Sequence, residues 1–214
     1  MKIAFFVDFD GTITKKDTCV AMSEAFAVGD WKSFEEEWAQ GLINTAQCAR
    51  KTFKLFDADR ERLLRLLREI KIDDYFVPFL EMCRKRGYEI YILSDGYEIN
   101  VRTILENHGI SDVPFFANEL VISGGDFDIQ SPHASDSCDE CGTCKTELLN
   151  KLKPADALTV YIGDGLSDTC ASKETDVVFG KGKLLAHRRE NHLPVLPFED
   201  FRAILEWEEK LRHS

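Results

Sequence analysis

The sequence predicts an α/β fold: a Rossmann-like, doubly wound parallel sheet with a small helical cap inserted after the first strand. Three short apolar runs, at residues 3–7, 89–93 and 158–162, are typical of strands that are buried on both faces. Helical patterns lie between these runs, as parallel strands require. Each run ends in small polar or acidic residues, so we expect these ends to meet in one crevice at the carboxyl edge of the sheet.

The segment from residue 16 to residue 75 contains helical patterns and no strand candidate. Four residues that favour the N-cap position precede its apolar stretches: Asp17, Asp30, Asn44 and Asp59. We therefore expect a helical cap domain at residues 16–75, inserted into a core domain made of residues 1–15 and 76–214. Most aromatic side chains of the cap are expected to pack in its interior, and one or two are candidates for the wall of a substrate pocket.

The rest of the core is expected to alternate helices with strands. Apolar periodicity predicts helices at residues 75–86, 98–108, 146–152, 184–189 and 199–211. Residues 115–122 and 127–130 flank the sequence Ser-Gly-Gly-Asp, which is a hairpin signal that suits the edge of the sheet. Residues 176–179 predict a further short parallel strand.

Composition and charge exclude several classes of function. The chain has 214 residues, 44% of them hydrophobic, and a net charge of −11. That charge argues against binding nucleic acid or an anionic membrane surface by bulk electrostatics. No apolar run is long enough to cross a bilayer, and the chain enters its first strand without a leader, so we expect a cytoplasmic protein. The seven cysteines are odd in number and mostly scattered, unlike a secreted disulfide framework.

Two aspartates follow the first strand, one residue apart. Asp8 and Asp10 point the same way on an extended chain, and Gly11 lets the backbone approach a ligand closely. Asp8 is ionised at neutral pH and can attack phosphorus without a base, which forms an aspartyl-phosphate. Asp10 can protonate the departing alkoxide and then take a proton from the water that hydrolyses the intermediate. An ordinary strand end followed by an Asx turn explains the same residues without any catalytic role. The choice between the two interpretations therefore depends on the residues at the other strand ends.

An acidic protein that handles phosphate needs local cations. Asp8 and Asp164 can hold Mg²⁺ through carboxylate oxygens, together with water and the substrate phosphate. Lys145, at the start of a predicted helix, can reach the same crevice and neutralise charge on the transferred group. Asp168 follows Asp164 by one turn, and we expect it to hold Lys145 or a metal-bound water.

Short polar residues at the strand ends are candidates for binding phosphate and substrate. Ser94 and Thr12 can orient phosphate oxygens through their hydroxyl groups. The full set of candidates is Gly11, Thr12, Asp17, Ser94, Asp95 and Gly96. Asp17 fits two roles equally: a plain helix N-cap, and a substrate contact where the cap meets the core. Ser94 also fits the role of an ordinary turn residue.

Four motifs occur in order along the chain: Asp8-Phe9-Asp10-Gly11-Thr12, Ser94, Lys145 and Gly163-Asp164-Gly165-Leu166-Ser167-Asp168. In this order they resemble the motifs of the haloacid dehalogenase (HAD) superfamily, and the helical insertion resembles the type-one cap of its phosphoserine phosphatases. The resemblance implies a Rossmann-like core, a Mg²⁺ requirement, Asp8 as nucleophile and the backbone carbonyl of Asp10 as a metal ligand. The side chain of Asp10 further implies rapid hydrolysis of the phosphoenzyme, and so a phosphatase or a phosphomutase.

A second group of residues narrows the resemblance. It comprises Cys138-x-x-Cys141-Gly142-x-Cys144-Lys145, with His133 upstream, and Leu196-Pro197-Phe198-Glu199-Asp200-Phe201 near the C-terminus. The group is similar to the phosphatases of methionine salvage, which act on a hydroxyketo-methylthiopentenyl phosphate. That family is expected to carry glycine where this chain has Asp95, which leaves the substrate open.

These patterns predict a Mg²⁺-dependent phosphomonoesterase that acts on a small phosphorylated metabolite, with the methylthiopentenyl compound as the candidate substrate. One alternative is a phosphoserine phosphatase, in which Arg50 or Lys51 would meet the substrate carboxylate. Another is a catalytically silent HAD-like domain that binds a phosphorylated ligand or a protein partner, although such a domain has no need of the acid Asp10. We expect no nucleic-acid or membrane partner, and the sequence indicates no particular oligomeric state.

Three cysteines cluster just before Lys145. Cys138, Cys141 and Cys144 form a Cys₃His set with His133, which suits a tetrahedral Zn²⁺ site that would brace the loop. Free thiols, or a labile disulfide between neighbouring cysteines, explain the same pattern. The remaining cysteines lie in apolar helical settings and are expected to be small core residues: Cys19, Cys48, Cys83 and Cys170.

Overall fold

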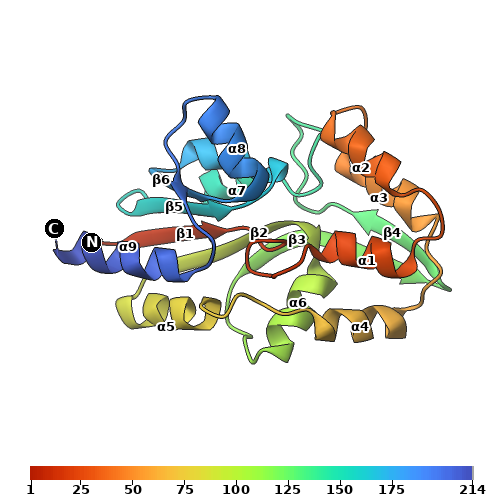
Figure 1. Cartoon of the computed structure of the whole chain (residues 1–214), viewed down its shortest axis with the longest axis horizontal. Helices are drawn as coiled ribbons and strands as arrows, with labels where there is room; N and C mark the ends of the chain where they lie inside the picture. The colour runs from red at the N-terminus through yellow and green to blue at the C-terminus, as the bar shows by residue number, and fades with distance from the viewer. Residues whose placement is uncertain (214) are drawn as a thin grey trace.

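The protein is described by a computed structural model that covers residues 1–213. Its centre is a seven-stranded sheet in the order β4-β3-β2-β1-β5-β6-β7, parallel throughout except for β4, which runs antiparallel to β3. The strands are β1 (Ile3–Val7), β2 (Glu89–Tyr97), β3 (Phe115–Ser123), β4 (Asp126–Gln130), β5 (Leu158–Gly163), β6 (Val177–Gly180) and β7 (Leu196–Pro197). Helices cover both faces of the sheet (Figure 1), so the predicted fold class is confirmed.

Every helix that the sequence predicts is present. The helices are α1 (Thr18–Phe26), α2 (Lys32–Ala39), α3 (Thr45–Phe53), α4 (Arg60–Glu69), α5 (Phe76–Arg86), α6 (Glu98–Asn107), α7 (Lys145–Leu152), α8 (Gly182–Glu190) and α9 (Arg202–His213). Three predicted N-caps satisfy a free backbone N–H at a helix start: Asp17 in α1, Asn44 in α3 and Asp59 in α4. Local capping chemistry therefore places three of the four helix starts in the insertion, whereas α2 begins without a side-chain cap at its N-cap residue, Trp31.

The central strand β1 is buried on both faces because it lies between two parallel neighbours. Its last residue, Val7, pairs with Ile92 of β2 and with Ile162 of β5. The pairing of β1 with both neighbours therefore ends at the same level of the sheet, and β2 continues beyond it. This register brings the polar residues that follow each strand to one edge, as the doubly wound topology requires.

Aromatic side chains of β1 anchor a layer of helices on each face of the sheet. Phe5 packs edge-to-face on Phe79 of α5, on the face that α9 also covers. Phe6 stacks on Tyr91 and belongs to the cluster on the opposite face, which includes Leu149 of α7 and Leu184 of α8. The period-two alternation of the strand thus builds both layers from neighbouring residues.

The inserted helices share the interior of the sheet domain. Met22 of α1 and Phe53 of α3 belong to the same buried cluster as Val7 of β1. Helix α4 packs on α6, and α3 packs on β4 at the end of the hairpin (Figure 1). The cap is therefore fused to the core through continuous packing, and its aromatic residues do not form a separate bundle interior. The domain boundaries at residues 15 and 75 stay a prediction.

Two elements differ from the sequence expectation in length. Strand β2 continues four residues past Leu93, because Tyr97 pairs with Asn118 after an irregularity in the ladder. Helix α9 begins at Arg202 instead of residue 199. The β3–β4 hairpin lies at the sheet edge, as predicted. No helix among the described residues is long and apolar enough to cross a membrane.

Phe201 tests the aromatic packing that fastens α9 to the core. Its ring is fully buried, with its centroid 5.1 Å from that of Phe76 and 5.0 Å from that of Phe79. We expect Phe201→Ala to lower the free energy of unfolding by about 3–5 kcal/mol, because a large cavity replaces the ring. Val28→Ala, at a residue that is 72% exposed, is the control and should change it by less than ~0.5 kcal/mol. Equal small effects in urea unfolding would contradict this packing role.

Candidate active site

The predicted nucleophile lies directly beyond the end of β1. Asp8 is buried, and its backbone N–H still donates to Ile162 of β5, so the strand pairing holds it in place. The chain then turns at Gly11, whose φ is +77°. A Cβ atom there would lie 2.6 Å from Oδ2 of Asp164, so only glycine allows the two motifs to approach this closely.

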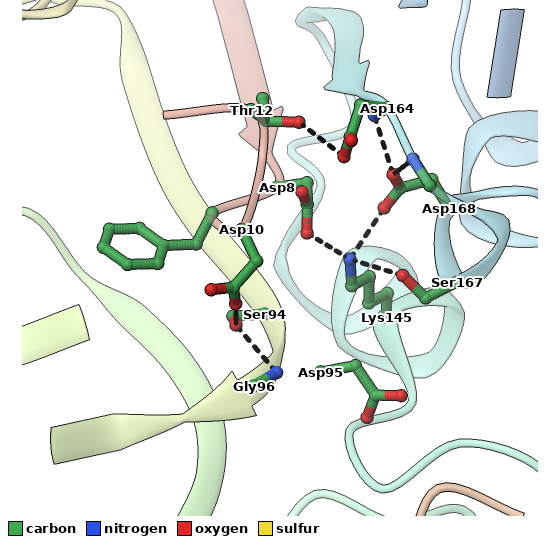
Figure 2. Close-up of polar contacts among 12 residues, drawn as sticks. Asp8, Asp10, Thr12, Ser94, Asp95, Gly96, Lys145, Asp164, Ser167 and Asp168 are labelled. Atoms are coloured by element: carbon green, nitrogen blue, oxygen red, sulfur yellow. Dashed lines mark hydrogen bonds and ion pairs between the residues drawn. The ribbon is translucent and has the colours of Figure 1, made fainter. Parts of the chain in front are cut away.

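A buried lysine joins the motifs together. Nζ of Lys145 lies 2.5 Å from Oδ1 of Asp8, 2.7 Å from Oδ1 of Asp168 and 3.3 Å from Oγ of Ser167 (Figure 2). The lysine is only 3% exposed, at the first turn of α7. Residues that are 137 positions apart in the chain thus form one buried ion cluster.

Asp168 binds this lysine, and each of its two carboxylate oxygens accepts two hydrogen bonds. Its Oδ2 accepts hydrogen bonds from the backbone N–H groups of Asp164 and Gly165, at 3.0 and 2.9 Å. Its Oδ1 accepts from Lys145 and from the hydroxyl of Tyr161, each at 2.7 Å. Of the two roles predicted for Asp168, the structure therefore favours holding the lysine.

Carboxylates outnumber the lysine in this cluster, and the pKa values of Asp8 and Asp164 are raised. The pKa of Asp8 is well above its ordinary value, first because the group is buried and then because Asp168 repels its charge. Burial and Asp168 likewise raise the pKa of Asp164. Burial lowers the pKa of Lys145, but attraction to Asp168 and Asp8 outweighs it, so the net pKa is raised. The cluster therefore favours a further positive charge.

A divalent cation fits this donor set. Carboxylate oxygens of Asp8, Asp164 and Asp168 lie within 4.8 Å of one another, and such oxygens are the ligands that Mg²⁺ prefers. Because Asp168 is already saturated, Asp8 and Asp164 are the side chains available to a metal. Oδ1 of Asp164 accepts a 3.1 Å hydrogen bond from the hydroxyl of Thr12, which orients this carboxylate. Thr12 therefore contacts a metal-ligand candidate in the structure, whereas the sequence assigned it to phosphate.

The predicted acid, Asp10, has different neighbours. Its Oδ1 accepts from the backbone N–H of Thr18 at 3.1 Å and from the Thr18 hydroxyl, and its Oδ2 accepts from Ser94 at 3.0 Å. The Ser94 hydroxyl in turn accepts from the N–H of Gly96 at 2.9 Å (Figure 2). A Cβ atom on Gly96 would collide with Oδ2 of Asp10, so glycine is required beside the acid.

Asp95 points away from the catalytic carboxylates (Figure 2). Its carboxylate accepts hydrogen bonds from Thr45 Oγ1 at 2.8 Å, from the Thr143 N–H at 2.8 Å and from Asn118 Nδ2 at 3.2 Å. Thr45 belongs to the cap helix α3, and Thr143 precedes Lys145 by two residues. Asp95 thus connects the cap, the hairpin and the loop before the lysine. The part that the sequence suggested for Asp95 in binding phosphate or substrate stays a prediction.

A cavity of about 400 Å³ opens beside the carboxylates. The core contributes the charged or small residues Asp8, Asp10, Asp164 and Gly96 to its lining. The cap contributes apolar and aromatic side chains: Met22, Trp38, Phe53 and Phe56. The volume suits a small metabolite, and the lining offers both charged and apolar surfaces.

Asp17 is the N-cap of α1 and also lines the cavity, so the N-cap role is confirmed and its contact with substrate stays a prediction. Its carboxylate accepts from the N–H of Val20. Burial, followed by repulsion from Asp10, raises the pKa of Asp17 to about 7.

The cysteine loop does not form the predicted zinc site. Among residues 1–213, metal-sized groups of ligand atoms occur at Asp8, Asp164 and Asp168 and at Asp10, Asp17 and Cys19. The set of His133, Cys138, Cys141 and Cys144 is not one of them, and the His133 ring packs on Phe116 instead. All described cysteines are free thiols, and burial raises the pKa of Cys141 to about 12, so it is not a ready thiolate.

The four scattered cysteines have mixed surroundings. Cys83 is a buried core residue, as expected. Cys170 is exposed, and Cys19 and Cys48 line the cavity. The expected core position is therefore wrong for Cys170. For Cys19 and Cys48, an apolar helical setting in the sequence did not distinguish a core position from a cavity wall.

Two basic residues proposed to meet a substrate carboxylate lie outside the cavity. Arg50 contacts Asp128 Oδ1 at 2.8 Å and the carbonyl of Ile129 at 3.1 Å. Lys51 pairs with Glu37. The side of α3 that carries them faces the hairpin and α2 instead of the site.

Sequence reasoning missed several residues that hold the site together. Tyr161 supports Asp168, Asn118 supports Asp95, and Thr18 and Asn100 support Asp10. Only Thr18 carried a signal, since it follows Asp17 directly after the first motif. The others are isolated residues whose partners are more than 20 positions away or lie across a strand end, so no local pattern marks them.

The profile of a family described as Putative Phosphatase matches residues 3–208. The chain belongs to this family. It is a phosphatase, as its motifs predict. It is 32% identical over 211 residues to the 2-hydroxy-3-keto-5-methylthiopentenyl-1-phosphate phosphatase of Brevibacillus brevis, covering 95% of this chain and 94% of that protein. Identity is also 32% to the protein of the same name from Geobacillus kaustophilus, with 96% and 94% covered.

Solved structures share the fold of this phosphatase. A phospho-aspartyl intermediate analogue of phosphoserine phosphatase superposes with a TM-score of 0.76 at 24% identity, covering 96% of this chain and 98% of that one. A substrate-bound phosphoserine phosphatase complex superposes with a TM-score of 0.76 at 23% identity, covering 97% and 98%. The HAD fold that the motifs predict is therefore confirmed.

Asp17→Asn tests the crowding of carboxylates. The folded-state pKa of about 7 exceeds the ordinary value of 3.8, so the folded protein binds the proton more tightly than the unfolded chain. Its contribution therefore lowers stability as pH rises from about 4 to about 7 and is constant above. Because asparagine keeps the cap but carries no charge, we expect the stability advantage of the variant to grow by about 1–2 kcal/mol between pH 5 and pH 8.

The measurement is urea unfolding at both pH values with a chelator present, so that no cation binds the carboxylates. Asp59→Asn is the matched control, because Asp59 caps α4 in the same way but lies on the surface outside the cluster. An advantage of Asp17→Asn that does not change with pH would contradict the crowding.

Proposed function

We propose that this phosphatase hydrolyses a small phosphomonoester through an aspartyl-phosphate on Asp8, with Mg²⁺ as its cofactor. The observation that carries the proposal is the buried cluster of Asp8, Lys145 and Asp168 beside a cavity of about 400 Å³. A nucleophile, a fixed positive charge and space for a leaving group thus lie together. Phosphoryl transfer through an aspartyl-phosphate requires this combination.

In the first step a carboxylate oxygen of Asp8 attacks phosphorus, and the bond from phosphorus to the ester oxygen breaks. Lys145 is bound to Oδ1 of Asp8, so Oδ2 is the oxygen free to attack. Lys145 also offsets charge on the transferred group. Asp10 gives its proton to the departing ester oxygen, so the alcohol leaves neutral.

In the second step a water molecule attacks the same phosphorus, and Asp10 takes a proton from it. The bond between phosphorus and Asp8 breaks, which restores the carboxylate and releases inorganic phosphate. Ser94 donates its hydroxyl proton to Asp10 at 3.0 Å in the structure, and we propose that the hydroxyl turns to a phosphate oxygen when substrate binds. Mg²⁺, held by Asp8, Asp164 and, as the superfamily resemblance implies, the backbone carbonyl of Asp10, would supply positive charge opposite the phosphate.

The cavity supports a neutral, partly apolar leaving group. Met22, Phe53 and Phe56 of the cap line it. The charged lining residues outside the catalytic centre are three acids and one base: Asp17, Glu35, Asp95 and Lys183. We propose 2-hydroxy-3-keto-5-methylthiopentenyl-1-phosphate, for which the curated relatives are named, as the substrate. Its uncharged chain with a terminal thioether suits the apolar cap surface.

The alternatives receive less support. A phosphoserine phosphatase must accommodate a carboxylate, yet Arg50 and Lys51 are bound elsewhere. The basic residue Lys183 does line the cavity, but three acids lie on the same lining: Asp17, Glu35 and Asp95. A silent binding domain has no use for the acid Asp10 beside a buried nucleophile. The free thiols of the described cysteines fit a reducing compartment, so we propose that the enzyme acts in the cytoplasm.

Phosphate release from a panel of metabolite phosphates tests the activity directly. The panel contains the methylthiopentenyl phosphate, phosphoserine and simple alkyl phosphates, each with Mg²⁺ and with a chelator. We expect the methylthiopentenyl ester to have the highest kcat/KM and the chelator to abolish turnover. Asp8→Asn should lower kcat by at least ~10³-fold and leave the fold intact, whereas the exposed Asp30→Asn should change nothing. Wild-type turnover by Asp8→Asn would contradict the covalent mechanism.

Arg50→Ala and Lys51→Ala test the choice between substrate classes. Both side chains make surface ion pairs outside the cavity, so each variant should retain kcat/KM for the preferred substrate within about twofold. Phe53→Ala, which removes an apolar wall, should raise KM for that substrate at least ~10-fold. A large loss in the Arg50 variant that is specific to phosphoserine would favour the phosphoserine phosphatase.

A further inference from the structure

An asparagine in the core lies behind the predicted acid without any role in the steps above. Asn100, on α6, is completely buried. Its Nδ2 donates to the hydroxyl oxygen of Thr18 at 2.9 Å and lies 3.2 Å from the sulfur of Met22. Its Oδ1 has no hydrogen-bond partner among residues 1–213. A buried amide with one unsatisfied oxygen is unfavourable, so its retention points to the contact that it does make.

That contact determines the direction of the Thr18 hydroxyl. A hydroxyl group has one proton to donate. Because Asn100 donates to Thr18, the oxygen acts as acceptor on that side, and its own proton is directed at Oδ1 of Asp10. The opposite orientation of the amide would draw the Thr18 proton towards Asn100 and leave the amide N–H groups with only Met22 as a neighbour. The pattern in the structure is the one that satisfies the most groups.

Asp10 therefore has two unequal oxygens. Oδ1 accepts two hydrogen bonds from Thr18, one from its backbone N–H at 3.1 Å and one from its hydroxyl. Within the described residues 1–213, Oδ2 accepts only from Ser94, at 3.0 Å, and it lies beside Gly96 on the lining of the cavity. An oxygen that already accepts two protons in hydrogen bonds is a poor place for a third, so an added proton belongs on Oδ2.

We propose that Asn100 and Thr18 are positioning residues for the acid. They commit Oδ1 of Asp10 as a hydrogen-bond acceptor and reserve Oδ2 for proton transfer to the leaving oxygen and from the attacking water. The proposal rests on the phosphatase mechanism above. A positioning role differs from a purely structural role in one respect. Removing the hydrogen bonds of Asn100 and Thr18 should slow only those steps in which Asp10 must move a proton.

Leaving-group dependence separates the two roles. The probes are p-nitrophenyl phosphate, whose phenolate leaves without a proton, and the best alkyl phosphate from the panel, whose alkoxide needs one. The quantity is kcat/KM, because it reports the reaction only up to formation of the phosphoenzyme. Asp10→Asn removes the acid and so shows the largest loss to be expected. We expect it to lower kcat/KM by ~10²–10⁴-fold for the alkyl ester and far less for the aryl ester.

The variants remove one hydrogen bond at a time. We expect Thr18→Val to lower kcat/KM about 30-fold for the alkyl ester and less than about threefold for the aryl ester. Asn100→Leu, which keeps the volume, should lower the alkyl value about 10-fold with the same selectivity. Thr18→Ser keeps the hydroxyl and should rescue activity to within about threefold.

Thr159→Val is the matched control. Thr159 is also buried and its hydroxyl also donates to an aspartate, Asp176, at 2.7 Å, but it does not line the cavity. The Thr159→Val variant should leave the ratio of kcat/KM for the two substrates unchanged.

Equal losses for both esters in Thr18→Val, or no loss in either, would overturn the inference while phosphatase activity stands. If Asn100→Leu does not fold, the comparison of Thr18→Val with Thr18→Ser decides the question alone, and a wild-type protein that hydrolyses neither ester would overturn the proposed function itself.

Discussion

The ion cluster of Lys145, Asp8 and Asp168 is the interaction on which the rest of the site depends. Burying these charges is unfavourable unless each is paired and hydrogen-bonded. The structure meets this condition with Tyr161 and with two backbone N–H groups that bind Asp168. The parallel sheet makes the arrangement feasible, because the pairing of β1 with β2 and with β5 ends at one level, and the polar residues that follow lie at the same edge.

The cap completes the site but does not form a hydrophobic core of its own. Its apolar side chains join the interior of the sheet domain, and its polar contacts converge on Asp95 and on the loop before Lys145. The backbone N–H of Thr45 also donates to the carbonyl of Glu140 in that loop, at 3.0 Å. The cap surface that would select the substrate is thus connected mechanically to the lysine that neutralises the phosphate.

Much of the fold was predictable because its signals are local. Buried strands, N-caps such as Asn44 and the glycine turn of the hairpin each depend on a few neighbouring residues, and the structure confirms them. The cysteine loop shows the limit of spacing as evidence. Its ligand spacing suits zinc, but the backbone of the loop is directed by contacts with the cap, and the side chains do not converge. Arg50 illustrates the same limit, since its direction depends on the hairpin that packs against α3.

The sequence alone determined the α/β class, the helical insertion and the order of the catalytic motifs, because strand pattern, capping chemistry and motif order are written in contiguous residues. Tertiary structure alone decided which groups support the chemistry. Asn100 contacts Thr18 across 82 positions, and Asp95 contacts Thr45 across 50. Hydrogen bonds between such distant residues form only when packing has brought the elements together, so no local sequence pattern predicts them.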